Sequence, residues 1–170
     1  VPVWNPDTCV QCTQCSYVCP HAAIRPVAMT EEEAKNAPEG MKMTDLKMMP
    51  GYKFAINVSV LDCTGCGSCA NVCPGNVKNQ TLVMQPLAEN ADKQAFFDYA
   101  VKLPEKQEVI EKFKTSTVKG SQFKKPLLEF SGACAGFGET PYAKLVTQLF
   151  GDRMYISNAT GCSSIWGRSE

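Results

Sequence analysis

One cysteine pattern occurs twice in this chain of 170 residues and constrains its fold more than any other feature. Each copy has three cysteines separated by pairs of residues, then a fourth cysteine after three more residues, and then a proline. The copies are Cys9-x2-Cys12-x2-Cys15-x3-Cys19-Pro20 and Cys63-x2-Cys66-x2-Cys69-x3-Cys73-Pro74. The first residues lack the basic and apolar regions of a secretion signal, so this cysteine content favours metal binding or catalysis over disulfides.

The spacing is typical of bacterial ferredoxins that hold two [4Fe–4S] clusters. Three closely spaced thiolates can surround one corner of an iron–sulfur cube, and the short chain after them cannot bring the fourth to the same cube. The fourth cysteine then serves the other cluster. We therefore expect cluster 1 to use Cys9, Cys12, Cys15 and Cys73, and cluster 2 to use Cys63, Cys66, Cys69 and Cys19.

Zinc binding and disulfide formation are the alternative uses of these cysteines. Zinc also accepts four thiolates, but zinc sites usually draw them from separated C-x2-C pairs. Disulfides would require neighbouring cysteines on one tight loop to face each other, which their geometry resists. The pattern favours two [4Fe–4S] clusters, with zinc as the remaining alternative.

Composition excludes several classes of function. The chain has 17 basic and 17 acidic side chains and no net charge, whereas a nucleic-acid-binding protein needs a basic surface. It contains no apolar run long enough to cross a bilayer. Iron–sulfur clusters require reducing surroundings, so we expect the cytoplasm or another reducing, anaerobic compartment.

The segment between the two cysteine runs is long for this pattern. Thr30-Glu31-Glu32-Glu33 predicts a capping box that opens a short helix, and Tyr52 to Leu61 alternates like a strand. Methionines in this segment favour adaptable packing over a neighbouring surface, with a cover over a cluster as the alternative. We expect His21, the only histidine, to have a surface or capping role rather than to bind metal.

The rest of the chain predicts helices and then part of a second domain. Thr81 to Met84 reads as a strand, and 90–102 and 104–114 read as helices, with Pro104 at a first helical position. We expect 115–125 to be a linker. After it, strands at Leu127–Phe130 and Met154–Ile156 flank a helix that begins at Thr140 as its N-cap and runs to Phe150. Glycine turns follow both strands, an order typical of a doubly wound parallel sheet.

We therefore predict an α+β chain with three parts. Residues 1–86 form a two-cluster ferredoxin-like module with an insertion at about 25–53. Residues 87–126 form a helical connector, and 127–170 an incomplete βαβ piece of a doubly wound α/β domain.

The later motifs resemble the pyruvate:ferredoxin oxidoreductase family. They are Phe130-Ser131-Gly132-Ala133-Cys134-Ala135-Gly136-x-Gly138-Glu139-Thr140-Pro141-Tyr142 and Asn158-Ala159-Thr160-Gly161-Cys162-Ser163-Ser164-Ile165-Trp166-Gly167. The resemblance covers nearly the whole chain. It implies an internal fragment of a much longer protein, consisting of the ferredoxin domain and the start of the thiamine-diphosphate domain.

The resemblance also implies the reaction of the full enzyme. Pyruvate is decarboxylated on thiamine diphosphate held with Mg²⁺, the acetyl group passes to coenzyme A, and electrons leave through clusters to ferredoxin or flavodoxin. A third [4Fe–4S] cluster in the family matches Cys134, position 137 and Cys162 here, but position 137 is Phe137. We therefore expect no third cluster, Cys134 and Cys162 as small buried thiols, Glu139 and Ser163 as thiamine-pocket residues of the full enzyme, and no catalysis by this chain alone.

Three functions remain open from the sequence. The chain is an electron-transfer segment of such an oxidoreductase, a stand-alone two-cluster carrier, or a zinc-stabilised interaction module. The polar 115–125 segment and the unfinished sheet argue against the carrier, which needs neither.

Overall fold

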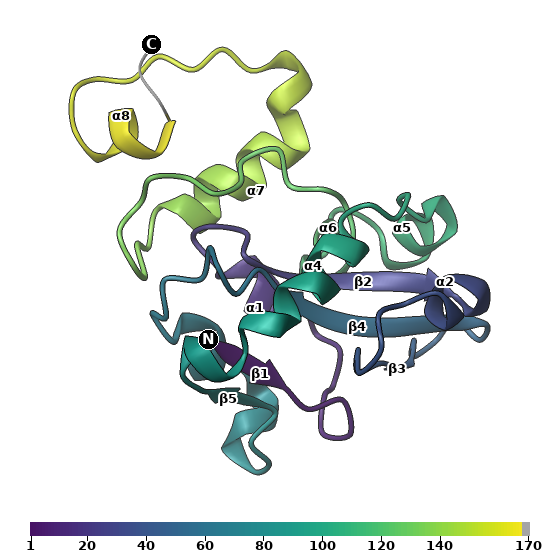
Figure 1. The fold of residues 1–170 in the computed structure, drawn as a ribbon. Coiled ribbons are helices and arrows are strands. Elements are labelled where there is room, and N and C mark those ends of the chain that lie inside the picture. Colours follow the sequence, from purple (N-terminus) through teal and green to yellow (C-terminus); the bar gives the residue numbers. More distant parts are fainter. Residues whose placement is uncertain (168–170) are drawn as a thin grey trace.

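A computed structural model describes residues 1–167 as a mixed α+β structure with two small antiparallel sheets and short helices around them (Figure 1). One sheet pairs β1 with β5, and the other has the strand order β2-β4-β3. The C-terminal part, which carries α7 and α8, projects from one side of this body (Figure 1). None of the helices in residues 1–167 is long and apolar enough to cross a membrane.

The strands are short, and most of the helices are single turns or a little longer. The strands are β1 (Pro2–Trp4), β2 (Ile24–Thr30), β3 (Thr44–Asp45), β4 (Tyr52–Val58) and β5 (Leu82–Met84). The α-helices are α1 (Gln14–Tyr17), α2 (Glu31–Lys35), α3 (Ser68–Asn71), α4 (Gln94–Ala100), α5 (Gln107–Phe113), α6 (Val118–Ser121), α7 (Thr140–Phe150) and α8 (Cys162–Gly167). The 3₁₀ turns are η1 (Pro74–Val77), η2 (Leu87–Glu89), η3 (Ala91–Lys93) and η4 (Gly151–Arg153).

The insertion between the cysteine runs forms most of the larger sheet. β2 and β4 pair along their full length, from Ile24 opposite Val58 to Thr30 opposite Tyr52. The predicted capping box is confirmed, because Thr30 accepts a hydrogen bond from the Glu33 backbone and Glu33 accepts one from the Thr30 backbone. The short helix that it opens, α2, ends at Lys35.

Aromatic side chains connect the insertion to the helices that follow the second cysteine run. Phe54 on β4 is fully buried, and its ring meets Trp4 edge-on at 5.9 Å and Phe123 edge-on at 6.2 Å. Phe123 also stacks on Phe113 of α5 at 5.6 Å. Met29 and Met41 are buried in the same core, which agrees with the packing role predicted for the methionines, whereas Met48 is 72% exposed.

The segment 115–125 is packed, so the linker prediction was wrong. It contains α6, and Ser121 and Gln122 are buried. The buried Ser16 hydroxyl donates a hydrogen bond to the Gln122 side chain at 2.8 Å. The polar side chains that suggested a solvated linker instead satisfy buried polar groups of the cysteine module.

The helix predicted over 104–114 begins later than expected. α5 starts at Gln107, so Pro104 precedes the helix instead of occupying its first position. Val109, Ile110 and Phe113 form the buried face of this helix.

The two strands predicted in the C-terminal part are absent from the described structure. Residues 127–130 and 154–156 are irregular, and Leu127 and Tyr155 are exposed. A strand needs a neighbour for its backbone groups, and the Phe130 N–H instead donates to the carbonyl of His21 at 2.9 Å. The helix between them does form, but Glu139 is its N-cap and Thr140 its first residue.

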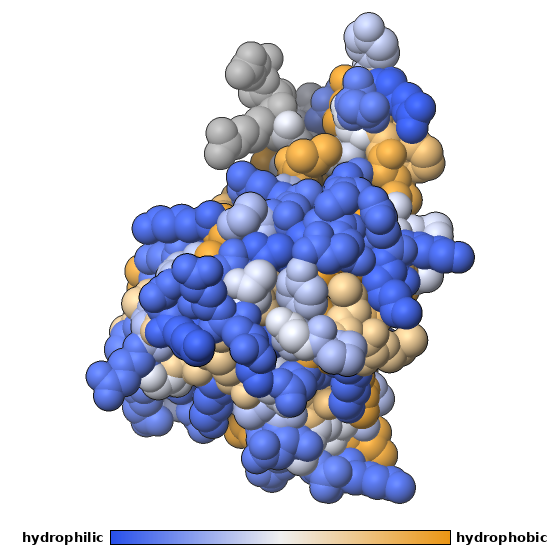
Figure 2. Space-filling view, turned by 90° about the vertical axis from the view of Figure 1, so that its right-hand side faces the viewer, coloured by the Kyte–Doolittle hydropathy of each residue, from blue (hydrophilic) through white to orange (hydrophobic). Residues whose placement is uncertain are grey.

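Figure 2 shows that one face of the body is largely hydrophilic, whereas hydrophobic atoms gather around the projecting C-terminal part. Tyr155, Ile156 and Ile165 are among the exposed apolar residues there. An apolar surface of this kind is typical of a region that contacts other protein.

The ion pair between Glu33 and Lys106 predicts a pH-dependent contribution to stability. Burial alone would raise the pKa of Glu33, but hydrogen bonds from Lys106 and Thr30 outweigh it and hold the pKa below its ordinary value. This stability is present above about pH 4.5 and is lost as the pH falls through the lowered pKa. We expect Glu33→Gln, which can still cap the helix, to cost about 1 kcal/mol of unfolding free energy near pH 7.

Denaturant unfolding at pH 7 and near pH 3.5 measures this difference. The cost should shrink at the lower pH, because protonation of Glu33 in the unfolded chain removes part of the stability that the lowered pKa provides. Glu32→Gln, at an exposed position of the same helix, is the control. An equal cost at both pH values would contradict the assignment.

Candidate metal centre

The two cysteine runs adopt the same local backbone. Gly65 and Gly67 in the second run have left-handed φ angles of 70° and 78°, and Gln11 and Thr13 at the equivalent places have 60° and 61°. Thr13 and Gly67 each precede a short helix, α1 and α3 respectively. The left-handed residues turn the chain sharply between successive cysteines.

The first run achieves this curl without glycine, and buried hydrogen bonds hold it. Gln11 is 1% exposed, donates to the carbonyl of Asp45 at 2.8 Å and accepts from the backbone N–H of Lys47 at 2.9 Å. Its own N–H donates to the Cys9 sulfur at 3.3 Å. The Met-rich insertion is thus fastened onto the first cysteine loop.

Pairing of β1 with β5 brings the last cysteine of the second run to the first run. The pairing ends with Trp4 opposite Leu82. Next to this pair, the Thr81 hydroxyl donates to the Thr8 hydroxyl at 2.8 Å. A Cβ at Gly75 would lie 2.1 Å from the Thr81 hydroxyl oxygen, so only glycine permits this approach. Burial raises the pKa of the Cys73 thiol, and its neighbours Cys12 and Cys9 raise it further.

Pairing of β2 with β4 has the same effect on Cys19. Beyond the Ile24–Val58 pair, the Ser59 N–H donates to the Ala23 carbonyl at 2.7 Å, so the chain leaving the first run lies beside the chain entering the second. Cys19 and the first three cysteines of the second run, Cys63, Cys66 and Cys69, line one cavity.

Electrostatic interactions connect neighbouring thiols both within the two sets and between them. Burial raises the pKa of Cys69 to about 12, and the thiols of Cys19, Cys63 and Cys66 contribute. Burial likewise raises the pKa of Cys15, and the thiols of Cys69, Cys9 and Cys12 contribute. Because Cys69 acts on Cys15, the two sets are close neighbours. Buried thiols that repel one another as anions require positive charge to be held as thiolates.

This arrangement suits an iron–sulfur cube better than one ion. Within residues 1–167, no group of three or more His, Cys, Asp or Glu side chains is close enough to share a single metal ion. In a [4Fe–4S] cube each thiolate binds a different iron, so its ligands surround a larger body. Backbone N–H groups are also available to the sulfurs, as Gln11 shows at Cys9, and such bonds tune cluster potentials.

The glycine turn at 132–138 lies against the second cysteine run. A Cβ at Gly136 would lie 3.4 Å from the Cβ of Cys66. Burial acts to raise the pKa of Cys66, but hydrogen bonds from Ser68, Thr64 and the Gly136 backbone outweigh it and lower it. The turn therefore forms part of the surroundings of the second set of thiols.

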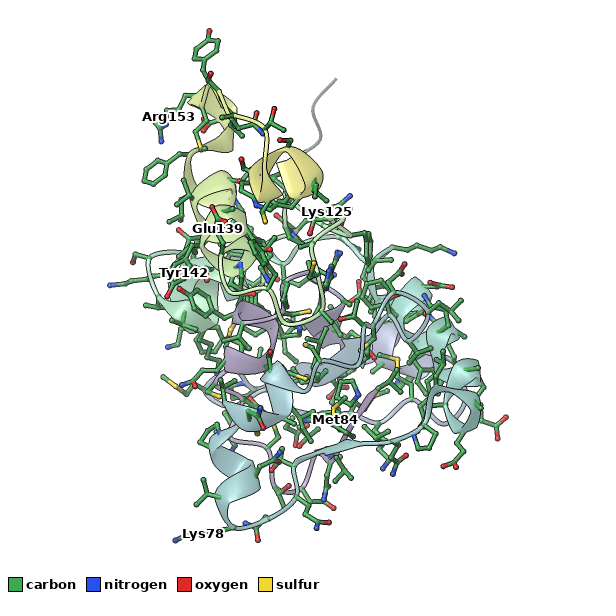
Figure 3. The ribbon with its side chains drawn as sticks, turned by 90° about the vertical axis from the view of Figure 1, so that its left-hand side faces the viewer. Lys78, Met84, Lys125, Glu139, Tyr142 and Arg153 are labelled. Atoms are coloured by element: carbon green, nitrogen blue, oxygen red, sulfur yellow. The ribbon has the colours of Figure 1, made fainter. Side chains whose placement is uncertain are left out.

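The remaining predicted site residues lie away from these thiols or on the surface. Cys134 and Cys162 are exposed, so the prediction that they are buried thiols was wrong. Glu139 is exposed at the start of α7 and is labelled in Figure 3. The Ser163 hydroxyl donates to the Ala159 carbonyl at 3.3 Å.

His21 is buried, so the surface role predicted for it was wrong. Its Nε2 atom lies 2.7 Å from the carbonyl oxygen of Ala133, and it is 5% exposed. Next to it, Arg25 forms an ion pair with Glu129 and lies over the rings of Phe97 and Phe130 at 5.1 and 5.4 Å. These contacts anchor the segment after residue 126 to the cysteine module.

Helix α7 docks through polar side chains, which sequence reasoning missed. Lys144 is 2% exposed and donates to the carbonyls of Ser16 and Cys19 at 2.8 and 3.0 Å. Gln148, one turn later, donates to the carbonyls of Ser121 and Lys124. Tyr142, on another face, is 67% exposed (Figure 3). Polar spacing along a helix ordinarily indicates a solvated face, so no local signal distinguished Lys144.

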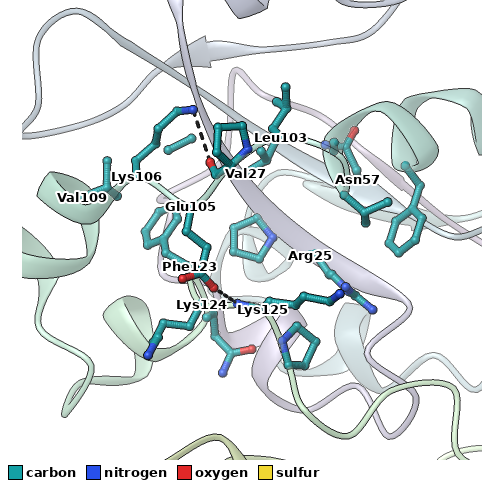
Figure 4. Close-up of a pocket in the computed structure, with 18 residues that line it drawn as sticks. Arg25, Val27, Asn57, Leu103, Glu105, Lys106, Val109, Phe123, Lys124 and Lys125 are labelled. Atoms are coloured by element: carbon teal, nitrogen blue, oxygen red, sulfur yellow. Dashed lines mark hydrogen bonds between the residues drawn. The ribbon is translucent and has the colours of Figure 1, made fainter.

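A separate pocket of about 200 Å³ lies beside β2 and is lined by the ends of α4 and α5 and by 122–126 (Figure 4). Arg25, Lys106, Val109 and Phe123 are among its lining residues, and no cysteine is. Its wall includes the backbone N–H of Lys125, which donates to the Glu105 side chain at 2.6 Å. The pocket is therefore distinct from the thiol sites.

Comparisons with known proteins agree with the geometry. The family described as "4Fe-4S double cluster binding domain" matches residues 8–76. The chain is 58% identical over 169 residues to "Pyruvate-flavodoxin oxidoreductase" of Enterobacter agglomerans and 59% identical over 172 residues to "Pyruvate:ferredoxin oxidoreductase" of Moorella thermoacetica. Each match covers 99% of this chain but 14% of the relative. A match at 52% identity is "Pyruvate dehydrogenase [NADP(+)]" of Cryptosporidium parvum, of which it covers 9%.

The Arg25 contacts predict how the glycine-turn segment is held. We expect Arg25→Ala to loosen residues 127–131, because it removes an ion pair, two aromatic contacts and a hydrogen bond to the Ala22 carbonyl. Hydrogen exchange of that segment should become faster by about tenfold or more, equivalent to at least ~1.4 kcal/mol of local stability. Arg153→Ala is the matched control, because Arg153 also pairs with a carboxylate and an aromatic ring but is exposed. Equal exchange rates in the two variants would contradict this assignment.

Proposed function

The chain belongs to the pyruvate:ferredoxin (flavodoxin) oxidoreductase family, and we propose that it is the segment of such an enzyme that carries electrons through two [4Fe–4S] clusters. The observation that carries the proposal is geometric: the pairing of β1 with β5 brings the region of Cys73 to the first run, and Cys19 lines one cavity with Cys63, Cys66 and Cys69. The double-cluster family match over residues 8–76 contains all eight. When bound, the clusters supply one-electron transfer.

We propose that cluster 1 uses Cys9, Cys12, Cys15 and Cys73, and that cluster 2 uses Cys63, Cys66, Cys69 and Cys19. The charge effects of Cys12 and Cys9 on Cys73, and of Cys19 on Cys69, support this exchange of the fourth ligand. The protein's part is to present thiolates, supply backbone N–H groups to the sulfurs and exclude water. The Met-rich insertion and the helices after the clusters contribute the apolar surroundings.

The chain spans about one seventh of the length of the two bacterial relatives quoted above, so the chemistry of the whole enzyme is part of the proposal. In that enzyme, pyruvate would be converted with coenzyme A at a thiamine diphosphate site that includes Mg²⁺. Glu139 and Ser163 are proposed residues of that site, and the segment after residue 126 would belong to its doubly wound α/β domain. A third cluster is not assigned to this chain, because Cys134 and Cys162 supply only two of the four thiolates required.

We propose ferredoxin or flavodoxin as the electron acceptor, as the names of the relatives indicate, and a reducing, anaerobic cytoplasm as the setting. A stand-alone carrier is not favoured. The similarity to the large oxidoreductases extends far beyond the double-cluster region, to 99% of the chain, and the docked helix α7 lies in this additional part.

Iron and sulfide analysis of anaerobically purified chain tests the cluster assignment. We expect about eight irons and about eight sulfides per chain, with a brown absorption near 400 nm that bleaches with dithionite. A colourless chain with about two zinc ions would refute electron transfer. About twelve irons would show that a third cluster forms here.

The exchange of the fourth ligand is tested by Cys73→Ala. We expect iron to fall from about eight to about four per chain, because cluster 1 loses a ligand although Cys73 belongs to the second run. The remaining electron paramagnetic resonance spectrum should match that of Cys9→Ala and differ from that of Cys63→Ala. Cys162→Ala, at an exposed cysteine outside both sets, should keep all the iron. A Cys73→Ala spectrum like that of Cys63→Ala would contradict the exchange.

A further inference from the structure

Lys144 places a positive charge inside the protein next to the cysteine module. It lies on α7, is 2% exposed, and donates hydrogen bonds to the carbonyls of Ser16 and Cys19. Both carbonyls belong to the short stretch that joins Cys15, in the first set of thiols, to Cys19, in the second. The ammonium group is therefore held at the junction of the two sets.

This buried charge has no carboxylate partner among residues 1–167. The ion pairs of the described chain are Arg25–Glu129, Lys53–Asp45, Lys106–Glu33 and Arg153–Asp152. Carbonyl oxygens satisfy two of the ammonium's three donors but carry no net charge. A buried ion without an opposite charge is strongly unfavourable, and Arg25, the charged neighbour that acts on Lys144 with the same sign, adds to the cost.

The negative charges that do act on Lys144 are sulfurs. Burial is the main cause that lowers the pKa of Lys144 to about 8, and Arg25 lowers it further, whereas the Cys19 and Cys15 thiols favour the protonated form. A cluster bound by four thiolates would carry net negative charge, and reduction adds one more. A fixed cation in a poorly screened interior stabilises the more negative state more strongly.

We propose that Lys144 is the built-in counter-charge of the two clusters and raises their reduction potentials, most of all that of the cluster held through Cys19. This inference rests on the cluster ligation proposed above. The direct hydrogen bond to the Cys19 carbonyl is the reason for the larger effect on cluster 2. In the step concerned, each oxidised cluster takes up one electron from a one-electron donor, with no bond made or broken by Lys144.

The proposal makes cluster potential depend on a helix outside the matched double-cluster region. Gln148 holds the next turn of α7 to the carbonyls of Ser121 and Lys124, and Arg25 and His21 hold the segment leading to α7. The docked C-terminal part would thus adjust the electron affinity of clusters whose ligands all precede it.

The test is a redox titration of Lys144→Met in the full chain, with dithionite as the electron donor and electron paramagnetic resonance as the readout. At a fixed potential, we expect the ratio of reduced to oxidised cluster 2 to fall by about tenfold, which is ~59 mV for a one-electron couple. Lys144→Arg, which keeps the charge, should remain close to the unmodified chain. Lys102→Met, at an exposed position, removes one positive charge elsewhere and should leave the ratio nearly unchanged.

The outcomes separate this proposal from the cluster assignment. Iron and colour in the unmodified chain test whether clusters form, and the variants test the role of Lys144. An unchanged ratio in Lys144→Met with full iron would overturn the proposal. Lys144→Met could also lose its iron. In that case, a Lys144→Arg variant that keeps its iron and its ratio of reduced to oxidised cluster 2 supports the role of the positive charge. Loss of iron from both variants assigns the effect to packing and overturns the proposal.

Discussion

Two antiparallel strand pairings make the cysteine module possible. β1 with β5 carries the region of Cys73 to the first run, and β2 with β4 carries the region of Cys19 to the second. Each set of four thiols therefore combines three residues from one loop with one from the other loop. Neither set can form unless the chain closes on itself in both places. Metal binding and folding are expected to be coupled for this reason.

The cysteine module is enclosed by parts of the chain that the two cysteine motifs do not predict. Gln11 fastens the Met-rich insertion to the first loop, and Phe54 joins this insertion to the helices after the clusters. Polar contacts hold the C-terminal segment to the cysteine module. Arg25 and His21 of the module contact Glu129 and Ala133 of the segment, and Lys144 of the segment contacts the Ser16 carbonyl of the module. An electron carrier benefits from such rigidity, because fixed dipoles and charges around a cluster help to set its potential.

The polar docking of α7 places the C-terminal part directly against the first cysteine run. Its buried face consists of Thr140, Pro141, Lys144 and, partly buried, Gln148, whereas Tyr142 and Val146 are exposed. An ordinary surface helix leaves its charged side chains in water, whereas α7 buries Lys144 and exposes Tyr142 and Val146. The exposed apolar side chains fit a segment that meets further protein in the longer relatives.

The sequence by itself determined the chemistry, because ligand spacing and tight turns are local properties. Two cysteine runs, the capping box at Thr30–Glu33 and the strands at 52–58 and 82–84 could all be predicted within a few residues. Only the tertiary structure decided which polar residues are buried, because burial depends on partners distant in the sequence. Lys144 and Gln122 looked like solvated side chains and instead meet carbonyls and hydroxyls of the first cysteine loop. The strands expected at 127–130 and 154–156 failed for the same reason, since a strand forms only where another segment supplies its hydrogen bonds.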